Sequence, residues 1–328
     1  MPISPLDSDD LGEAPAPAAA APAPDRPPVV ELPGWRSTFA GGLLRTARPK
    51  QWVKNVLVFA APGAAGVLTE GPVLARALGA FAAWCAAASG TYFLNDALDM
   101  AADRAHPRKR LRPVAAGVVS PAVAKAVAGL LLAVAVVVPL GWGAGGLSVV
   151  LATYVAIQIS YSCWLKEMPV IDLAAVASGF VLRAISGGVA ADVPLSNWFL
   201  IVASFGSLFM VAGKRHAEHL DLADDRGTHR RSLDAYSIDF LRQVRSVAAS
   251  VTITAYCLWA FERMDASPET PIGYQLSIVP FVLALLRYAL VVDAGRGGAP
   301  EEVVFSDRVL QVLGAVWVVA FAAGVYAS

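Results

Sequence analysis

Long runs without charged residues alternate with short basic and acidic segments along most of the chain. The longest run, residues 126–165, contains no Asp, Glu, Lys or Arg, and it is about twice the ~20 residues that a helix needs to cross a bilayer. The glycine-rich stretch 141–146 in its middle predicts a tight turn between two helices. The other expected spans lie at residues 55–69, 77–95, 173–191, 193–213, 246–261, 271–286 and 309–328. The pattern predicts nine transmembrane helices, the first extending backward through the amphipathic residues 43–53.

The composition favours an all-α integral membrane protein over a soluble one. Hydrophobic residues make up 56% of the 328 residues, charged residues make up 16%, and the mean hydropathy is +0.56. Soluble domains carry about a quarter charged residues, so a surface with this little charge has to face lipid. The formal net charge of zero excludes a broadly basic nucleic-acid-binding protein. The cysteines Cys85, Cys163 and Cys257 fall within apolar runs, and we expect them in the core, without disulfides or zinc.

The first 33 residues differ from the rest of the chain. Nine of the 22 prolines lie there, together with an alanine-rich stretch and a cluster of acidic residues. Such a segment buries too little apolar surface to offset its chain entropy, so residues 1–33 are predicted to be a disordered tail. It has neither the basic start nor the continuous apolar core of a signal peptide. Residues 34–328 are expected to form the membrane domain.

The basic residues indicate how the domain lies in the membrane. Lysine and arginine gather near residues 45–54, 104–112 and 214–245, which precede the first expected span or follow even-numbered ones. The opposite loops contain Arg76, Arg263 and few other cations. Because basic loops stay in the cytoplasm, we expect a multi-pass protein of the inner cell membrane, with the N-terminus and the active site cytoplasmic.

Four oxygen-bearing side chains end the second expected span. Asn95, Asp96, Asp99 and Asp103 are spaced so that all four project from one face of a helix. Three carboxylates held so close repel one another unless a cation lies among them, and oxygen ligands of this kind select Mg²⁺, which usually completes its coordination with substrate phosphates. The alternative is a solvated helix end, where acidic residues are common.

Two basic segments are candidates for phosphate binding. The first directly follows the acidic residues and contains Arg104, Arg108, Lys109, Arg110 and Arg112. It can recognise an anion, or it can only hold its loop in the cytoplasm.

The second basic segment opens the long polar stretch 214–245, which is expected to be a loop. There we interpret Lys214 and Arg215 as phosphate ligands and Glu218 as a further metal carboxylate. His216 and His219 could hold a transition metal, but no thiol or third histidine has matching spacing.

Two further cations lie in or beside expected spans. Arg183 lies eleven residues after Asp172, on the order of 16 Å deeper along a helix. A charge at that depth normally has a partner or faces water, so Arg183 either orients an anionic substrate or pairs with Asp172 or a loop acid. Lys54 either reaches the membrane surface by snorkelling or contacts a phosphate.

These motifs resemble the UbiA-type prenyltransferase superfamily from about residue 44 to the C-terminus. The resemblance rests on R-P-x-Q-W-x-K-N at 48–55, N-D-x-x-D-x-x-x-D at 95–103 and R-x-I-x-G-G at 183–188. Further segments, P-L-S-x-W-F at 194–199 and K-R-x-A-E at 214–218, resemble a branch that transfers phosphoribose. Most of the superfamily carries a second D-x-x-x-D motif after the sixth span, whereas here that spacing comes only at Asp221 and Asp225. Fewer acids at this point suit a donor with an additional phosphate.

The resemblance implies a Mg²⁺-dependent transferase with a nine-helix bundle and a cytoplasmic active site. It implies transfer of 5-phosphoribose from 5-phosphoribosyl 1-diphosphate to a polyprenyl phosphate such as decaprenyl phosphate, for arabinan synthesis in the cell wall. Its implied metal and catalytic set is Asn95 with Asp96, Asp99 and Asp103. Its implied substrate-binding set is Lys54, Asn95, Arg104, Lys109, Arg110, Arg112, Tyr161, Arg183, Lys214, Arg215 and Glu218. A homo-oligomer is left open.

Two other functions compete with this one. The first is a polyprenyl transferase that uses a prenyl diphosphate and an aromatic or lipid acceptor. The second is a cation-coupled transporter with the three aspartates as its ion site. Transporters tend to place ionisable groups near the bilayer midplane, whereas these cluster at one surface.

Overall fold

The structure is a computed structural model, and it describes residues 34–224, 235–266, 272–295 and 300–326. The predicted disordered tail and the central part of the predicted loop at 225–234 lie outside the described residues. Within the described ranges every regular element is a helix. The long helices are α3 (Gly71–Leu98), α5 (Pro121–Gly141), α6 (Gly145–Cys163), α7 (Ile171–Ala191), α8 (Asn197–Asp224), α10 (Ile238–Ala266), α11 (Gly273–Asp293) and α13 (Arg308–Tyr326). The short ones are η1 (Gly34–Ser37), α1 (Phe39–Ala47), η2 (Pro49–Phe59), α2 (Ala60–Ala64), α4 (Met100–Ala105), η3 (Lys109–Leu111), η4 (Leu165–Glu167) and α12 (Pro300–Ser306).

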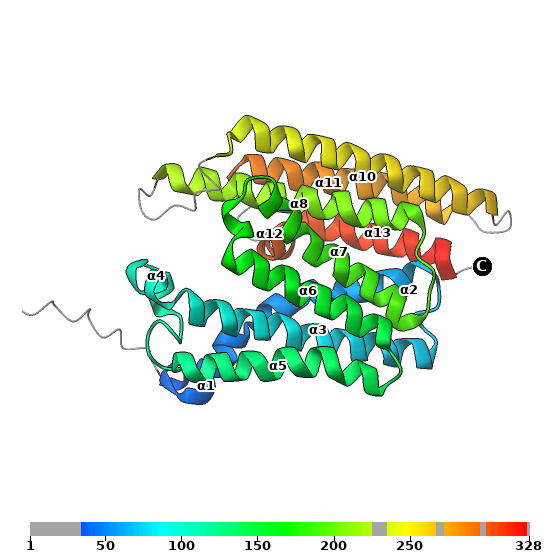
Figure 1. Cartoon of the computed structure of the whole chain (residues 1–328). Helices are drawn as coiled ribbons and strands as arrows, with labels where there is room; N and C mark the ends of the chain where they lie inside the picture. The colour runs from blue at the N-terminus through cyan, green and yellow to red at the C-terminus, as the bar shows by residue number, and fades with distance from the viewer. Residues whose placement is uncertain (1–33, 225–234, 267–271, 296–299, 327–328) are drawn as a thin grey trace, which may run out of the picture.

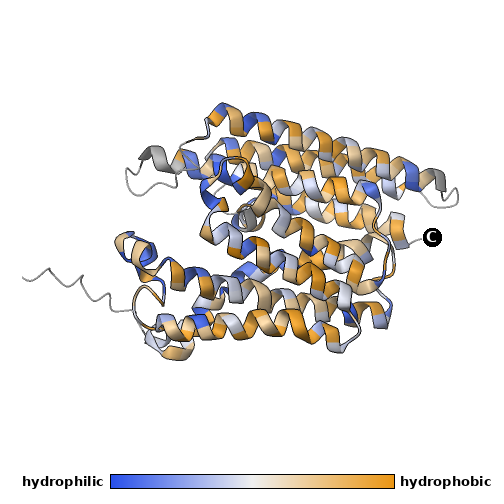
Figure 2. Cartoon of the chain, viewed as in Figure 1, coloured by the Kyte–Doolittle hydropathy of each residue, from blue (hydrophilic) through white to orange (hydrophobic). Residues whose placement is uncertain are grey.

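Eight of the described helices are long and apolar enough to cross a membrane, so the chain is a multi-pass membrane protein. The predicted turn at 141–146 is confirmed, since α5 ends at Gly141, Gly143 has a φ of +72° and α6 begins at Gly145. The outer faces carry exposed apolar side chains such as Leu130, which is 64% exposed. Figure 2 shows hydrophobic positions along the middle of the bundle and hydrophilic ones toward its ends. That distribution is expected where lipid is the solvent.

The predicted first span is not one continuous α-helix. Residues 43–69 form the end of α1, the 3₁₀ segment η2 and the short α2. Arg48, between α1 and η2, has a left-handed backbone with a φ of 53°, and Pro49 follows it. The η2 backbone also lies directly on α7, because a Cβ built on Gly187 would come within 1.8 Å of the Val58 carbonyl oxygen. Tertiary packing therefore holds a broken segment where hydropathy predicted a regular helix.

The predicted polar loop 214–245 is helical over much of its length. α8 continues to Asp224 and α10 begins at Ile238, so Lys214, Arg215 and Glu218 lie on a helix. The helix continues here because its inward face remains buried, with Ala217 fully covered and His216 only 1% exposed. The prediction of a loop was wrong for these residues.

The helices form two groups joined by α7. Figure 1 shows α1, α3, α5 and α6 in one group and α8, α10, α11 and α13 in the other, with α7 in contact with both α6 and α8. Trp84, Leu147, Leu151 and Tyr154 form the core of the first group. Phe209, Tyr288 and Val292 belong to a core of the second. Each group therefore has its own packed interior.

The described cysteines only partly fit the expectation of a buried position. Cys85 is buried and Cys257 is half-buried, but Cys163 is exposed, because it is the last residue of α6. All three are free thiols in the structure.

One end of the bundle collects most of the charged residues of the candidate site. There α3 and α6 end and α7 begins, and α4 lies beyond the end of α3 (Figure 1). The short η3 contacts α4, and η4 contacts α6 and α7. We call it the charged end. It brings together side chains from separate stretches of the chain.

Candidate functional site

The acidic residues at the end of α3 divide into two pairs. α3 ends at Leu98, and Asp99, with φ −88° and ψ 5°, separates it from α4. The predicted single face is therefore interrupted. Asp96 and Asp103 face the loop that follows α4, while Asn95 and Asp99 face α6 and η4.

Asp96 and Asp103 converge on one guanidinium group. Arg112 Nη1 lies 2.7 Å from Asp103 Oδ2 and 3.4 Å from Asp96 Oδ1, and Arg48 Nη2 lies 2.6 Å from the same Asp96 oxygen. Both acids are almost fully buried, at 1% and 3% exposed. The left-handed turn at Arg48 directs its side chain toward α3, where it also lies over the Tyr92 ring. The two buried carboxylates of Asp96 and Asp103 thus contact the same guanidinium group, that of Arg112.

The second pair contacts a different part of the charged end. Ser162 Oγ donates to Asn95 Oδ1 at 2.5 Å, and Lys166 Nζ lies 3.5 Å from Asp99 Oδ1. The Asp99 side chain is 43% exposed. It therefore lies at the rim, where water and ligands reach it.

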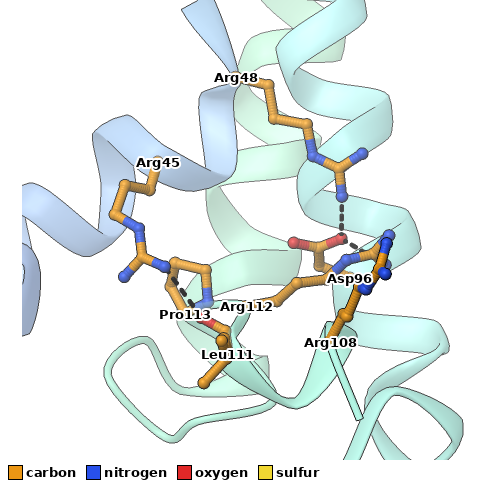
Figure 3. A pocket seen from close by; sticks show the side chains of 7 residues that line it. All are labelled: Arg45, Arg48, Asp96, Arg108, Leu111, Arg112 and Pro113. Atoms are coloured by element: carbon orange, nitrogen blue, oxygen red, sulfur yellow. Dashed lines mark hydrogen bonds and ion pairs between the residues drawn. The ribbon is translucent and has the colours of Figure 1, made fainter. Parts of the chain in front are cut away.

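An arginine-lined cavity lies beside Asp96. Its volume is about 240 Å³, and Figure 3 shows its lining of Arg45, Arg48, Asp96, Arg108, Leu111, Arg112 and Pro113. These residues come from α1, the junction between α1 and η2, α3 and the segment after α4. Of them, Asp96 and Arg112 were predicted from the sequence as site residues, and Arg108 as part of the candidate phosphate-binding segment. Arg48 could have been found from its place in the R-P-x-Q-W-x-K-N motif.

The other cations of the basic segment, and Lys54 on η2, lie outside the lining of this cavity. Arg104 donates from Nε to the Ala115 carbonyl at 3.0 Å, so it also stabilises its own loop. Lys109 and Arg110 lie on η3 and are exposed. Lys54 donates to Gln51 Oε1 at 2.5 Å within η2.

A second polar cluster joins α6, α7 and α8. The buried Arg215 guanidinium contacts Asp172 at 3.2 Å, Glu218 at 2.6 Å and the Tyr161 hydroxyl at 3.0 Å. Lys214 Nζ lies 3.7 Å from Glu218 and its side chain is 42% exposed. Arg215 and Glu218, predicted as a phosphate ligand and a metal carboxylate, thus lie together and bind each other.

Tyr236 completes this cluster and was not predicted from the sequence. Its hydroxyl donates to Asp172 Oδ1 and accepts from the Val170 backbone N–H at 2.5 Å. Burial, followed by the hydrogen bond to Asp172, raises the pKa of Tyr236 well above its usual value. No local sequence signal marks this residue, because its partners lie more than sixty positions away.

Arg183 has other partners than the acids suggested by the sequence. Its Nε donates to Asn55 Oδ1 at 2.7 Å and its Nη1 donates to the Gly179 carbonyl at 2.6 Å. The guanidinium carbon also lies 4.5 Å from the centroid of the Trp84 ring. Asp172 pairs with Arg215 instead. Arg183 therefore fastens η2 to α7 in the interior.

The donor atoms of the first pair suit a magnesium ion. Within the described ranges no three His, Cys, Asp or Glu side chains converge as a complete metal site. Mg²⁺, however, is commonly held by one or two carboxylates together with substrate phosphates. Asp96 and Asp103 already converge on one nitrogen atom of Arg112, so their two carboxylate oxygens lie within reach of one cation. The buried His216 contacts Arg245, which does not favour a transition metal there.

The fold and the site define a multi-pass helical membrane protein with buried carboxylates and arginines gathered at one end. The UbiA prenyltransferase family matches residues 56–307, and the chain belongs to this family. This confirms the resemblance drawn from the motifs.

Curated relatives are similar over nearly their whole length. The chain is 46% identical over 301 residues to a decaprenyl-phosphate phosphoribosyltransferase of Mycolicibacterium smegmatis, covering 88% of this chain and 94% of that protein. It is 47% identical over 292 residues to the protein of the same name from Corynebacterium glutamicum, covering 88% of each.

A solved structure of a UbiA homolog from Archaeoglobus fulgidus, bound to GPP and Mg²⁺, matches with a TM-score of 0.65 at 16% identity. The match covers 88% of this chain and 100% of that one. At this identity the likeness shows the fold alone.

Proposed function

We propose that the protein transfers 5-phosphoribose from 5-phosphoribosyl 1-diphosphate to a polyprenyl phosphate and releases diphosphate. The relatives at 46% and 47% identity carry the name of this activity. The observation that carries the proposal is the pair of buried carboxylates, Asp96 and Asp103, beside a cavity with four arginines. Such a site can hold a strongly anionic, metal-bound donor next to the membrane.

The charged end is proposed to face the cytoplasm. This orientation follows from the distribution of lysine and arginine, which the positive-inside rule relates to the cytoplasmic side. Residues 43–69 are proposed as a ninth, broken crossing that adds to the eight long helices. An irregular backbone at membrane depth is tolerated where protein surrounds it, and η2 packs against α7.

Asp96 and Asp103 are proposed to hold Mg²⁺ with the donor, and Asn95 and Asp99 complete the set from the adjacent face. When bound, Mg²⁺ would neutralise charge on the diphosphate leaving group. The remaining phosphate charge would be met by Lys54, Arg104, Lys109, Arg110, Arg112, Lys214 and Arg215. Tyr161 and Glu218 position Arg215, and Arg183 positions Asn55 below the site.

The transfer breaks the bond between the anomeric carbon and the diphosphate oxygen and forms a bond to an oxygen of the lipid phosphate. The lipid phosphate is already an anion at neutral pH, so the protein needs no strong general base. Attack from the face opposite the leaving group inverts the anomeric configuration. The side chains act mainly by positioning the two substrates and neutralising their charge.

The test is turnover by purified protein in detergent with labelled 5-phosphoribosyl 1-diphosphate and decaprenyl phosphate. We expect a labelled lipid product that a metal chelator abolishes. Asp103→Asn should lose this activity, while Asp239→Asn, which changes a side chain 90% exposed, should keep it.

A lipid product formed only from a prenyl diphosphate and an aromatic acceptor would refute the proposal in favour of ordinary prenyl transfer. Full activity in the presence of the chelator would refute the metal assignment.

A further inference from the structure

An apolar groove lies on α7 between α6 and α8. Its volume is about 390 Å³, and its lining includes Ile157 from α6, Ala174 and Val181 from α7, and Ser204 and Leu208 from α8. We propose that this groove, which we call the α7 groove, binds the isoprenoid chain of the lipid acceptor. The identity of that lipid rests on the proposed function.

The lining of the α7 groove suits a hydrocarbon chain. None of the described lining residues carries a charge, and the Ser178 hydroxyl donates to the Ala175 carbonyl of its own helix at 2.9 Å. α7 contacts both α6 and α8 (Figure 1), so α7 forms the floor of the groove and the other two helices form its walls. Ala174 is exposed and most of the other lining side chains are half-buried. An apolar chain can therefore enter the groove from outside the protein.

One end of the α7 groove lies at the charged end of the bundle. Ile157 and Tyr161 are one turn apart on α6, and Leu208 and Arg215 are two turns apart on α8, so each pair projects from one face of its helix. The Tyr161 hydroxyl lies 3.0 Å from Arg215 Nη2, and this contact joins α6 to α8 there. The Lys214 side chain, beside Arg215, is 42% exposed. A lipid with its chain in the groove thus brings its headgroup to cations, which favours a phosphate.

The same end of the groove lies beside the acids proposed for the donor. Ser162, which follows Tyr161, donates to Asn95 Oδ1 at 2.5 Å, and Asn95 directly precedes Asp96. The acceptor phosphate would therefore lie next to the metal-bound diphosphate, as a transfer between the two requires. This position, rather than the apolar lining alone, assigns the groove to the acceptor chain.

The size of the α7 groove limits how much of the chain it holds. At roughly 30 Å³ for each small group, as for a water molecule, a volume of about 390 Å³ holds on the order of a dozen carbon atoms, or about two to three isoprene units. We expect the isoprene units nearest the phosphate in the groove and the rest of a long chain in the bilayer. Farnesyl phosphate is thus long enough to serve as a probe.

The experiment fills the groove with an aromatic ring. Ala174→Phe does so from α7 and Ser204→Phe from α8, while Ala152→Phe places the same ring at an exposed position of α6 outside the lining. In both groove variants we expect the KM for farnesyl phosphate to rise at least about tenfold, the effect of even a small misfit in an apolar pocket. The KM for 5-phosphoribosyl 1-diphosphate should stay unchanged. The control variant should match the wild type.

Binding is measured separately from turnover, with a farnesyl phosphate analogue that carries a photoreactive diazirine at the end of its chain. After irradiation we expect adducts on the groove residues of α7 and α8. They should be lost in Ala174→Phe and in the presence of excess decaprenyl phosphate. Such adducts without phosphoribosyl transfer would support the groove and refute the proposed function.

An unchanged KM for farnesyl phosphate in active groove variants would overturn the inference and leave the proposed function intact. Adducts that phosphatidylglycerol removes as well as decaprenyl phosphate does would assign the groove to ordinary bilayer lipid instead. Loss of an oligomer in Ala174→Phe, with an unchanged KM, would assign it to a second copy of the chain. If Ala174→Phe does not fold, Ser204→Phe keeps the test decisive, and photolabelling of the wild type needs no variant.

Discussion

Replacing Gly187 with alanine tests how closely η2 is fastened to α7. The new Cβ would lie 1.8 Å from the Val58 carbonyl oxygen and 2.8 Å from its carbonyl carbon, and neither backbone atom can rotate away. Restoring normal contact requires the two elements to separate by roughly 1.5 Å. Overpacking of a well-filled interior costs about 1–3 kcal/mol.

The separation also affects the hydrogen bond that joins the same two elements. Arg183 Nε donates to Asn55 Oδ1 at 2.7 Å, and a buried hydrogen bond to a charged group contributes about 1.5–3 kcal/mol. We therefore expect Gly187→Ala to lower the free energy of unfolding by roughly 2.5–6 kcal/mol in total. Because η2 carries Lys54 and continues from Arg48, turnover should fall as well.

Thermal and denaturant unfolding in detergent measure the loss of stability, and product formation measures the loss of activity. Gly129→Ala and Gly314→Ala are matched controls, since a Cβ at either glycine meets nothing within 4 Å. Both should be at least as stable as the wild type. A Gly187→Ala protein with wild-type stability and full turnover would show that η2 does not rest on α7 as described.

Two further predictions concern hydroxyl and carboxyl groups at the ends of the helices. Tyr236→Phe should lower the free energy of unfolding by about 1.5–3 kcal/mol, because Asp172 loses a hydrogen-bond donor. Since the pKa of Tyr236 is raised in the folded protein, this contribution persists at neutral pH and is lost only as the pH rises above about 10. An equal difference in stability between wild type and variant at pH 8 and at pH 11 would contradict this. The hydrogen bond from Arg287 lowers the pKa of Asp307, so its contribution is complete above about pH 4 and is lost as the pH falls below that value. Thermal unfolding of Asp307→Asn should therefore be less sensitive to acid than that of the wild type, and parallel curves would count against the ion pair.

The sequence predicts the membrane helices well because uncharged runs are a direct signature of burial in lipid. The prediction of a continuous helix fails at residues 43–69. Their hydropathy suits a membrane span, but Arg48, Pro49 and the contact with Gly187 favour a broken segment. Prediction from the sequence also fails after Lys214, where charged residues suggested a loop although the inward face of α8 stays buried. In both places the deciding contacts come from distant parts of the chain.

The candidate site was also only partly predictable from the sequence. The spacing of the acids at 95–103 correctly predicted that they lie together at one end of a span, but it could not show that the helix ends at Leu98 and separates Asp96 from Asp99. The distant partners of the buried arginines, Asn55 for Arg183 and Asp172 for Arg215, were equally hidden, because they lie on other helices. A lysine or arginine in a basic segment has no local sequence feature that distinguishes a cavity-lining residue such as Arg45 from an exposed one such as Arg110.

The guanidinium of Arg112 already stands between Asp96 and Asp103, and this affects the order in which ligands load. A bare divalent ion has to compete with a tethered positive charge, so we expect it to bind weakly by itself. An ion that arrives with diphosphate offers Arg112 a new anionic partner in exchange for the one it releases. Calorimetric titration of the protein with magnesium, with and without inorganic diphosphate, should therefore give markedly tighter uptake in the second case, and equal affinities would contradict this exchange.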